Sequence, residues 1–126
     1  MLKVMIVDNE SAIRKGLVHC IHWGDLGCEI AAQADDGMMA LEQIPVIQPN
    51  IVISDIRMPV MDGLELAKEI HLKYPSIKTV ILSGYAEFEY AKEALSQGVV
   101  DYLLKPVASD QLENTLSKVK LELEKT

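Results

Sequence analysis

Short apolar runs alternate with helical patterns along the chain. Five runs have the length and composition of strands, namely KVMIVD (3–8), EIAAQAD (29–35), IVISDI (51–56), TVILSGY (79–85) and DYLLKP (101–106). Positions 4–7, 51–53 and 80–82 are apolar on successive residues, without alternation. Continuous apolar runs are typical of strands that are covered on both faces. The pattern therefore predicts a sheet buried between two layers.

Helical periodicity fills the segments that follow these runs. The first helix is expected to be capped by Ser11, and its apolar residues Ile13, Leu17 and Ile21 recur every four positions. The other helices are expected near 37–47, from Asp62-Gly63 to Pro75, near 87–97 and at about 108–125. Strand–helix pairs repeated five times require parallel strands joined by right-handed crossovers. We therefore predict an α/β fold, a doubly wound five-stranded parallel sheet with five helices.

The composition favours one globular cytoplasmic domain. The chain has 126 residues, 49% of them apolar, and a net charge of -7 from 19 acidic and 12 basic residues. So acidic a chain repels nucleic-acid phosphates and is not expected to grip DNA unaided. No apolar run approaches the ~18 residues of a membrane span, and the N-terminus turns acidic too early for a signal peptide. Cys20 and Cys28 lack metal-ligand spacing and are expected to be reduced thiols.

Polar residues stand at the carboxyl ends of the predicted strands, where open α/β sheets bind ligands. These residues are Asp8 and Asn9 after the first strand, Asp55 after the third, Ser83 after the fourth and Lys105 after the fifth. Oxygen atoms of Asp8, Asn9 and Asp55 can hold a hard cation such as Mg²⁺. Asp55 can then attack phosphorus as a nucleophile, while Ser83 and Lys105 stabilise phosphoryl oxygens. The set predicts phosphoryl transfer to Asp55.

Each of these residues has an ordinary interpretation when it is taken alone. A strand-end aspartate such as Asp55 is usually a cap or turn former, and Ser83 before a glycine is usually a turn residue. Lys105 alone would be a solvated surface lysine, and Tyr102 a half-buried strand aromatic. The functional interpretation therefore depends on the combination of residues at one sheet edge.

The segments IVDNE, ISDIRMPVMDG, ILSG and DYLLKP occur in the order and spacing found in one known family. Through them the chain resembles the response-regulator receiver domains of two-component signalling. The segments WGDLGCEI, SDIRMPVMDGLEL and SGYAEFEYAKEAL resemble the subgroup whose receiver precedes an AraC-type DNA-binding domain. The resemblance implies a flavodoxin-like sheet with strand order 2-1-3-4-5, formed by residues 1–126 as one receiver domain. The last helix is either a surface helix or one that leads into an output domain absent from this sequence.

The resemblance also implies individual roles. Asp55 matches the phosphoacceptor, and Lys105 matches the lysine of the family's site. The bond between Lys105 and Pro106 resembles one that is cis in the family. Arg57 would lend its main-chain carbonyl to Mg²⁺, together with Asp8, Asn9 and Asp55. Ser83 and Tyr102 match the pair that moves on activation. Arg57 and Tyr85 occupy the positions that tune hydrolysis, and their bulk predicts a long-lived phosphorylated form.

Asn9 departs from the family pattern, which has two adjacent acids after the first strand. An amide keeps one oxygen but loses a full charge, at a cost on the order of a few kcal/mol for a charge contact before desolvation. We therefore expect weaker Mg²⁺ binding than in a receiver with two acids at these positions.

The first functional hypothesis is a phosphorylation switch, which is a signalling domain and not an independent enzyme. A sensor histidine kinase would phosphorylate Asp55, and the surface of the fourth helix, fifth strand and fifth helix would then form a homodimer. The dimer would bring together two DNA-binding output domains. The alternative is a phosphorylation-independent protein-binding module, because Asn9 impairs the metal site. An aspartyl phosphatase is disfavoured because such enzymes carry a second aspartate two residues after the nucleophile, and this chain has Arg57 at that position. A flavin carrier is disfavoured because no Ser/Thr/Gly-rich loop follows the first strand.

Overall fold

The computed structural model describes residues 1–84, 99–104 and 108–124. Within these ranges one sheet contains five strands, β1 (Leu2–Val7), β2 (Cys28–Ala34), β3 (Ile51–Asp55), β4 (Lys78–Ser83) and β5 (Asp101–Leu104). All neighbouring strands pair in parallel, in the order β2-β1-β3-β4-β5. The predicted fold class and strand order are therefore confirmed.

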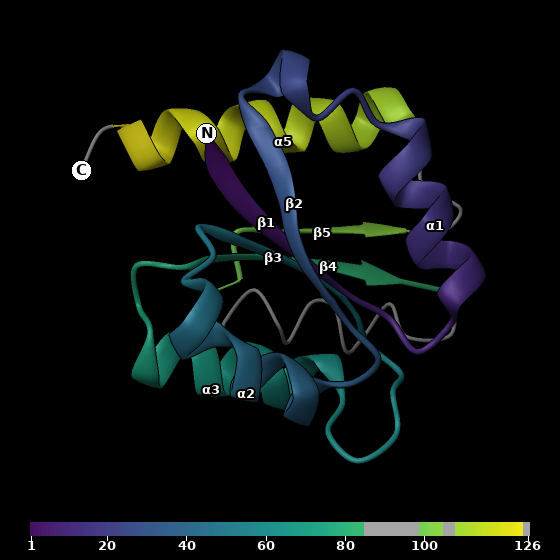
Figure 1. Ribbon diagram of the computed structural model, residues 1–126, viewed down its shortest axis with the longest axis vertical. Coiled ribbons are helices and arrows are strands. Elements are labelled where there is room, and N and C mark those ends of the chain that lie inside the picture. The colour runs from purple at the N-terminus through teal and green to yellow at the C-terminus, as the bar shows by residue number, and fades with distance from the viewer. Residues whose placement is uncertain (85–98, 105–107, 125–126) are drawn as a thin grey trace.

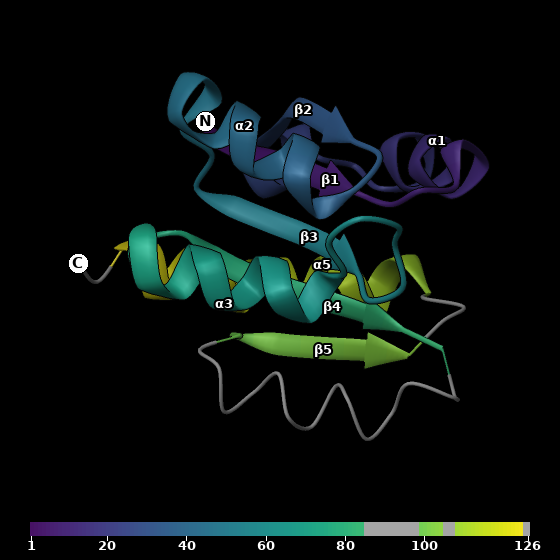
Figure 2. The same cartoon turned by 90° about the horizontal axis from the view of Figure 1, so that it is seen from below.

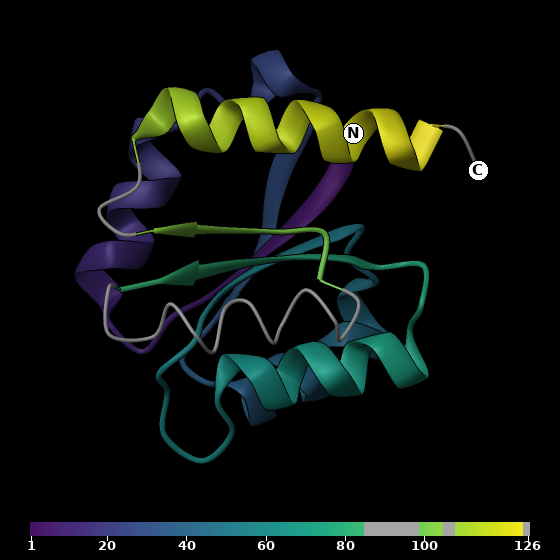
Figure 3. The same ribbon diagram turned by 180° about the vertical axis from the view of Figure 1, so that it is seen from behind.

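Helices cover both faces of the sheet, as Figure 1 shows. The described helices are α1 (Ser11–Cys20), α2 (Gly37–Ile47), α3 (Gly63–Lys73) and α5 (Ser109–Glu124), with a short 3-10 helix η1 (Gly24–Leu26) after α1. Figure 2 shows α2 and α3 side by side on one face, and Figure 3 shows α5 running along the other. The helix expected near 87–97 lies outside the described residues.

The core is divided by the sheet into two main clusters. On the α5 side, Leu112, Leu116 and Val119 pack with inward residues of β1, β3 and β4. On the α2 and α3 side, Ile44, Leu66 and Ile70 pack against the alternate residues of β1 and β3. Every residue of β3 is buried, which explains why this strand has a continuous apolar run. The carboxyl end of β3 is therefore held between two packed layers.

Two local expectations about α1 are wrong. Ser11 is the first helical residue, Glu10 occupies the cap position, and no side chain caps the helix. Instead, the Asp8 carboxylate accepts a hydrogen bond from the main-chain N–H of Glu10, at 2.9 Å. Ile21 lies just beyond the last helical residue, in an extended conformation, yet it is buried in the core. The four-residue apolar repeat therefore continues one position past the helix.

Helices α2 and α3 begin with side-chain caps. The Asp36 carboxylate accepts from Met39 N at 2.9 Å, and the Asp62 carboxylate accepts from Glu65 N at 2.8 Å. Aspartate is a favoured cap because its carboxylate satisfies an otherwise unpaired N–H of the first turn. Asp62-Gly63 thus opens α3 as predicted, and it ends the loop that follows Asp55.

Candidate functional site

Three of the predicted site residues meet at the carboxyl end of the sheet. Asp55 is the last residue of β3, which lies between β1 and β4. Asp8 follows β1 directly, and Ser83 ends β4. All three are buried, with exposed fractions of 1% for Asp8, 8% for Asp55 and 0% for Ser83. The structure therefore places Asp8 and Ser83 at the carboxyl ends of the two strands that flank the candidate nucleophile.

The main chain around Asp55 holds its carboxylate in place. Oδ1 of Asp55 accepts a hydrogen bond from Ile56 N at 2.8 Å, and the carbonyl oxygen of Asp55 accepts from Ser54 Oγ at 2.8 Å. The loop then returns to the strand end, because Gly63 N donates to the carbonyl oxygen of Ile56 at 2.7 Å. The first of these contacts orients the carboxylate, and the other two hold the main chain around it.

Asp8 is anchored through three different groups. Its N–H donates to the carbonyl oxygen of Ala34 at 3.0 Å, which links it to the end of β2. Its carboxylate accepts from Glu10 N, and its carbonyl oxygen accepts from Nη1 of Arg14. Arg14 was not among the residues that the sequence singled out. The only sequence feature that could have pointed to Arg14 is its place next to Ile13, on the apolar side of a predicted helix. An arginine at such a position can equally have a solvated side chain.

The hydroxyl of Ser83 is buried, and its oxygen has no hydrogen-bond partner among the residues that the structure describes. A buried polar group without a partner costs about 1–3 kcal/mol, and such groups in folded proteins call for an explanation. A ligand oxygen that accepts the hydroxyl hydrogen would remove this cost. The state of Ser83 therefore favours a ligand at this end of the sheet.

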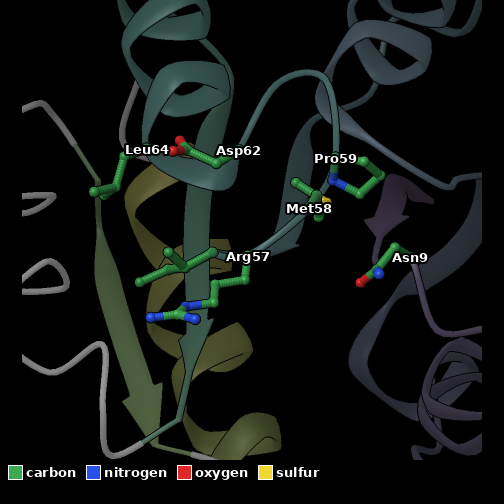
Figure 4. A pocket seen from close by; sticks show the side chains of 7 residues that line it. Asn9, Arg57, Met58, Pro59, Asp62 and Leu64 are labelled. Atoms are coloured by element: carbon green, nitrogen blue, oxygen red, sulfur yellow. The ribbon is translucent and has the colours of Figure 1, made fainter.

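A pocket of about 550 Å³ lies beside the strand ends (Figure 4). Its lining includes Asn9 from the loop after β1 and Arg57 from the loop after β3, both on the surface. The remaining lining residues are Ile56, Met58, Pro59, Asp62 and Leu64. Asn9 and Arg57 line this pocket from different loops.

The donor set fits a hard divalent cation. Two buried carboxylates, Asp8 and Asp55, stand at neighbouring strand ends, and a cation would offset the cost of keeping such charges away from water. The other candidate donors are neutral, namely the amide of Asn9 and the carbonyl of Arg57. Within the described ranges no group of three or more His, Cys, Asp or Glu side chains is arranged to hold a metal ion. Two acids and neutral oxygens suit Mg²⁺, which keeps several waters.

The remaining predicted residues are only partly placed. Lys105, Pro106 and Tyr85 lie outside the described residues; Leu104, which precedes Lys105, pairs with Ser83. Tyr102 is half-buried in β5 and packs against a cluster formed by Ile56, Ala67, Ile81 and Val99.

Among the described residues, none of the helices has both the length and the apolar character that a membrane span requires.

Comparison with known proteins gives consistent matches over nearly the whole chain. The family model of the response regulator receiver domain matches residues 4–117. The chain is 43% identical over 125 residues to the uncharacterized transcriptional regulatory protein YesN of Bacillus subtilis (strain 168), covering 99% of this chain and 34% of that protein. It is 44% identical over 119 residues to the transcriptional regulatory protein HptR of Staphylococcus aureus (strain N315), covering 94% and 46%. The chain thus spans less than half the length of these curated relatives.

Solved structures give the same result. The REC domain of AraT, a response regulator from Geobacillus stearothermophilus, superposes with a TM-score of 0.92 at 40% identity, covering 98% of this chain and 96% of that one. A two component transcriptional regulator AraC from Clostridium phytofermentans ISDg gives a TM-score of 0.91 at 34% identity, covering 99% and 97%. Both names agree with the resemblance of the sequence to receivers of the AraC-linked subgroup.

Proposed function

This chain belongs to the family of response regulator receiver domains, and on that basis we propose that Asp55 is its phosphoacceptor and a sensor histidine kinase its phosphodonor. One observation carries the proposal. Asp55 ends a fully buried strand between Asp8, a second buried carboxylate, and Ser83, a buried hydroxyl without a hydrogen-bond partner in the described part of the chain. Structural caps do not need this combination, whereas phosphoryl transfer does.

The transfer requires positioning and charge. A carboxylate oxygen of Asp55 forms a bond to phosphorus, the bond from phosphorus to the kinase histidine breaks, and the imidazole retains that electron pair. The hydrogen bond from Ile56 N to Oδ1 holds the carboxylate of Asp55 for this attack. Ser83 donates its hydroxyl hydrogen to one phosphoryl oxygen, and Lys105 places a positive charge near another.

Mg²⁺ would be held by Asp8, Asp55, Asn9 and the main-chain carbonyl of Arg57. When bound, it supplies positive charge that offsets the repulsion between these carboxylates and the phosphoryl group. Asn9 contributes an oxygen without a full charge. The affinity of the site should therefore be lower than with an acid at this position.

Phosphorylation would change a surface and bring two copies together. The phosphoryl group adds about −2 charge next to Ser83. Ser83 turns toward it, and Tyr102 fills the space that the loop after β4 leaves. The surface of the helix predicted near 87–97, β5 and α5 then pairs with a second receiver. Because the curated relatives are transcriptional regulators of greater length, we expect residues 1–126 to be the receiver of a longer cytoplasmic regulator that reaches DNA through an output domain.

Arg57 and Tyr85 would set the lifetime of the phosphorylated form. Both residues are bulky and stand two positions after Asp55 and Ser83, where they obstruct an attacking water. We expect the phosphorylated form to persist well beyond seconds at neutral pH, as followed by mass spectrometry after removal of the donor. Loss within seconds would show that these side chains do not shield the acyl phosphate.

Intact-mass measurement after incubation with acetyl phosphate and Mg²⁺ tests the proposal. The wild-type protein should gain one phosphoryl group, and Asp55→Asn should gain none. Asp62→Asn is the matched control, because Asp62 also lines the pocket but caps α3. It should still be phosphorylated. An adduct of the same yield in Asp55→Asn would refute the assignment of the phosphoacceptor.

The second candidate function is binding of a protein partner without phosphorylation, and Asn9 is the observation that favours it. If the weakened metal site prevents phosphorylation, wild-type protein will gain no phosphoryl group at any Mg²⁺ concentration. Asn9→Asp would then restore the adduct. An adduct on the wild-type protein supports the phosphorylation switch instead.

A further inference from the structure

Arg14 is largely enclosed although it belongs to a surface helix. Its side chain is 15% exposed, whereas α1 contains no fully buried residue. Its Nε atom is buried and has no hydrogen-bond partner within residues 1–84, 99–104 and 108–124. Its ion pair with Asp35 spans 2.9 Å, but the Asp35 side chain is 57% exposed. Exposed ion pairs contribute little to stability, so this contact alone does not account for an enclosed guanidinium.

The contacts of Arg14 connect two loops at the carboxyl end of the sheet. Nη1 of Arg14 donates to the carbonyl oxygen of Asp8 and also faces Oδ1 of Asp35. Asp8 begins the loop after β1, and Asp35 is the first residue after β2. The carboxylate of Asp8 accepts from Glu10 N at the start of α1. Asp8 is thus oriented by Glu10, at the cap position of α1, and by Arg14 within α1. The ion pair of Arg14 with Asp35 also links Asp8 to the end of β2.

We propose that Arg14 is a positioning residue for the metal-binding loop. By bridging the Asp8 carbonyl and Asp35, it holds the carboxylate of Asp8 and the amide of Asn9 in the orientation that binds Mg²⁺ beside Asp55. This inference rests on the proposed function. Groups that orient metal ligands from outside the coordination sphere strongly affect metal affinity.

The sign of the effect separates positioning from simple electrostatics. A guanidinium next to the site repels a divalent cation, so removing its charge would by itself tighten Mg²⁺ binding. Loss of a positioning contact has the opposite effect. Both contacts are made by Nη1 of Arg14. Arg14→Lys keeps the charge, but its shorter side chain ends in a compact ammonium that does not reach the position of Nη1, so it isolates the geometric contribution.

The test is a titration with Mg²⁺ alone, followed by NMR shifts of backbone amides, with urea denaturation of the same samples. Arg14→Ala should weaken Mg²⁺ affinity about tenfold, and Arg14→Lys should weaken it in the same direction. Lys15→Ala is the matched control, because it removes one positive charge from the exposed neighbouring position. Its Mg²⁺ affinity should equal or slightly exceed that of the wild type.

Affinity that is unchanged or tighter in folded Arg14→Ala and Arg14→Lys would overturn the inference. The inference would also be overturned if the Arg14 variants lost stability in urea but kept the Mg²⁺ affinity of the wild type, because a residue with only a structural role behaves in that way. If Arg14→Ala does not fold, Arg14→Lys decides the question. If either outcome overturns the role of Arg14, the proposed function still stands, provided that the wild-type protein binds Mg²⁺ and is phosphorylated. Failure of the wild type to bind Mg²⁺ would remove the proposed metal site and this inference together.

Discussion

Gly63 packs directly against the main chain of Asp55, the proposed phosphoacceptor, so replacing Gly63 by alanine should damage the site. A methyl carbon built at Gly63 would overlap the carbonyl oxygen of Asp55 and lie 2.9 Å from the Asp55 carbonyl carbon and 3.0 Å from Ile56 Cα. These are main-chain atoms and cannot rotate away. Carbon atoms are ordinarily in contact at about 3.5 Å. The overlap with the carbonyl oxygen is the most severe of these contacts, so the end of β3 and the start of α3 must separate by roughly 1 Å or more.

This displacement should lower both stability and phosphorylation. Overpacking of this kind costs about 1–3 kcal/mol, measured as the free energy of unfolding in urea. A displacement of about 1 Å at reacting groups can slow chemistry by on the order of 100-fold. The initial rate of phosphorylation of Gly63→Ala by acetyl phosphate, followed by intact mass, should fall by at least about tenfold.

Gly16→Ala is the matched control, since it makes the same chemical change in a different environment. Gly16 lies within α1, and a methyl carbon there would meet nothing within 4 Å. Alanine is favoured over glycine in a helix by about 1 kcal/mol, so this variant should be more stable and phosphorylated at the normal rate. The reasoning fails if Gly63→Ala keeps wild-type stability and rate, or if the two variants behave alike.

Three further predictions concern single positions. Asn9→Asp should tighten Mg²⁺ binding about tenfold, because it adds a charged ligand; unchanged affinity on titration would contradict this. Val60 is exposed and has a φ of 69°, a conformation that strains a β-branched residue. Val60→Asn should therefore raise the free energy of unfolding in urea by roughly 1 kcal/mol; an unchanged or lower unfolding midpoint would argue against strain. Burial raises the pKa of the Cys28 thiol, whereas Cys20 is exposed. Iodoacetamide should therefore modify Cys20 before Cys28; equal rates would show that Cys28 is accessible.

The sheet was predictable because burial on both faces leaves a direct mark on the sequence. β3 is buried throughout, so its run of apolar residues needed no periodicity to be recognised. The strand-end rule then placed Asp8, Asp55 and Ser83 at one end of the sheet, since parallel strands end together. β2 was recognised in spite of its alanines, one residue later than the structure begins it.

The details that sequence reasoning missed depend on contacts between distant segments. Serine is a favoured cap type, but the loop after β1 uses the Asp8 carboxylate near the start of α1 and leaves Ser11 without a capping role. Arg14 contacts the Asp8 carbonyl and also Asp35, which is 21 positions away in the chain. Ile21 continues the helical repeat but is buried in extended conformation, because the core reaches beyond the end of α1. Periodicity alone carries no information about such partners.

The most direct test of the account is a crystal structure with Mg²⁺ and beryllofluoride, which mimics a phosphoryl group on a carboxylate. Beryllium is predicted to bond to a carboxylate oxygen of Asp55, with Ser83 and Lys105 contacting the fluorides. Asp8, Asn9, Asp55 and the main-chain carbonyl of Arg57 are predicted to hold Mg²⁺. Beryllofluoride on another carboxylate, or Mg²⁺ held away from Asp8 and Asp55, would contradict the claim that these strand ends form one phosphoryl-accepting site.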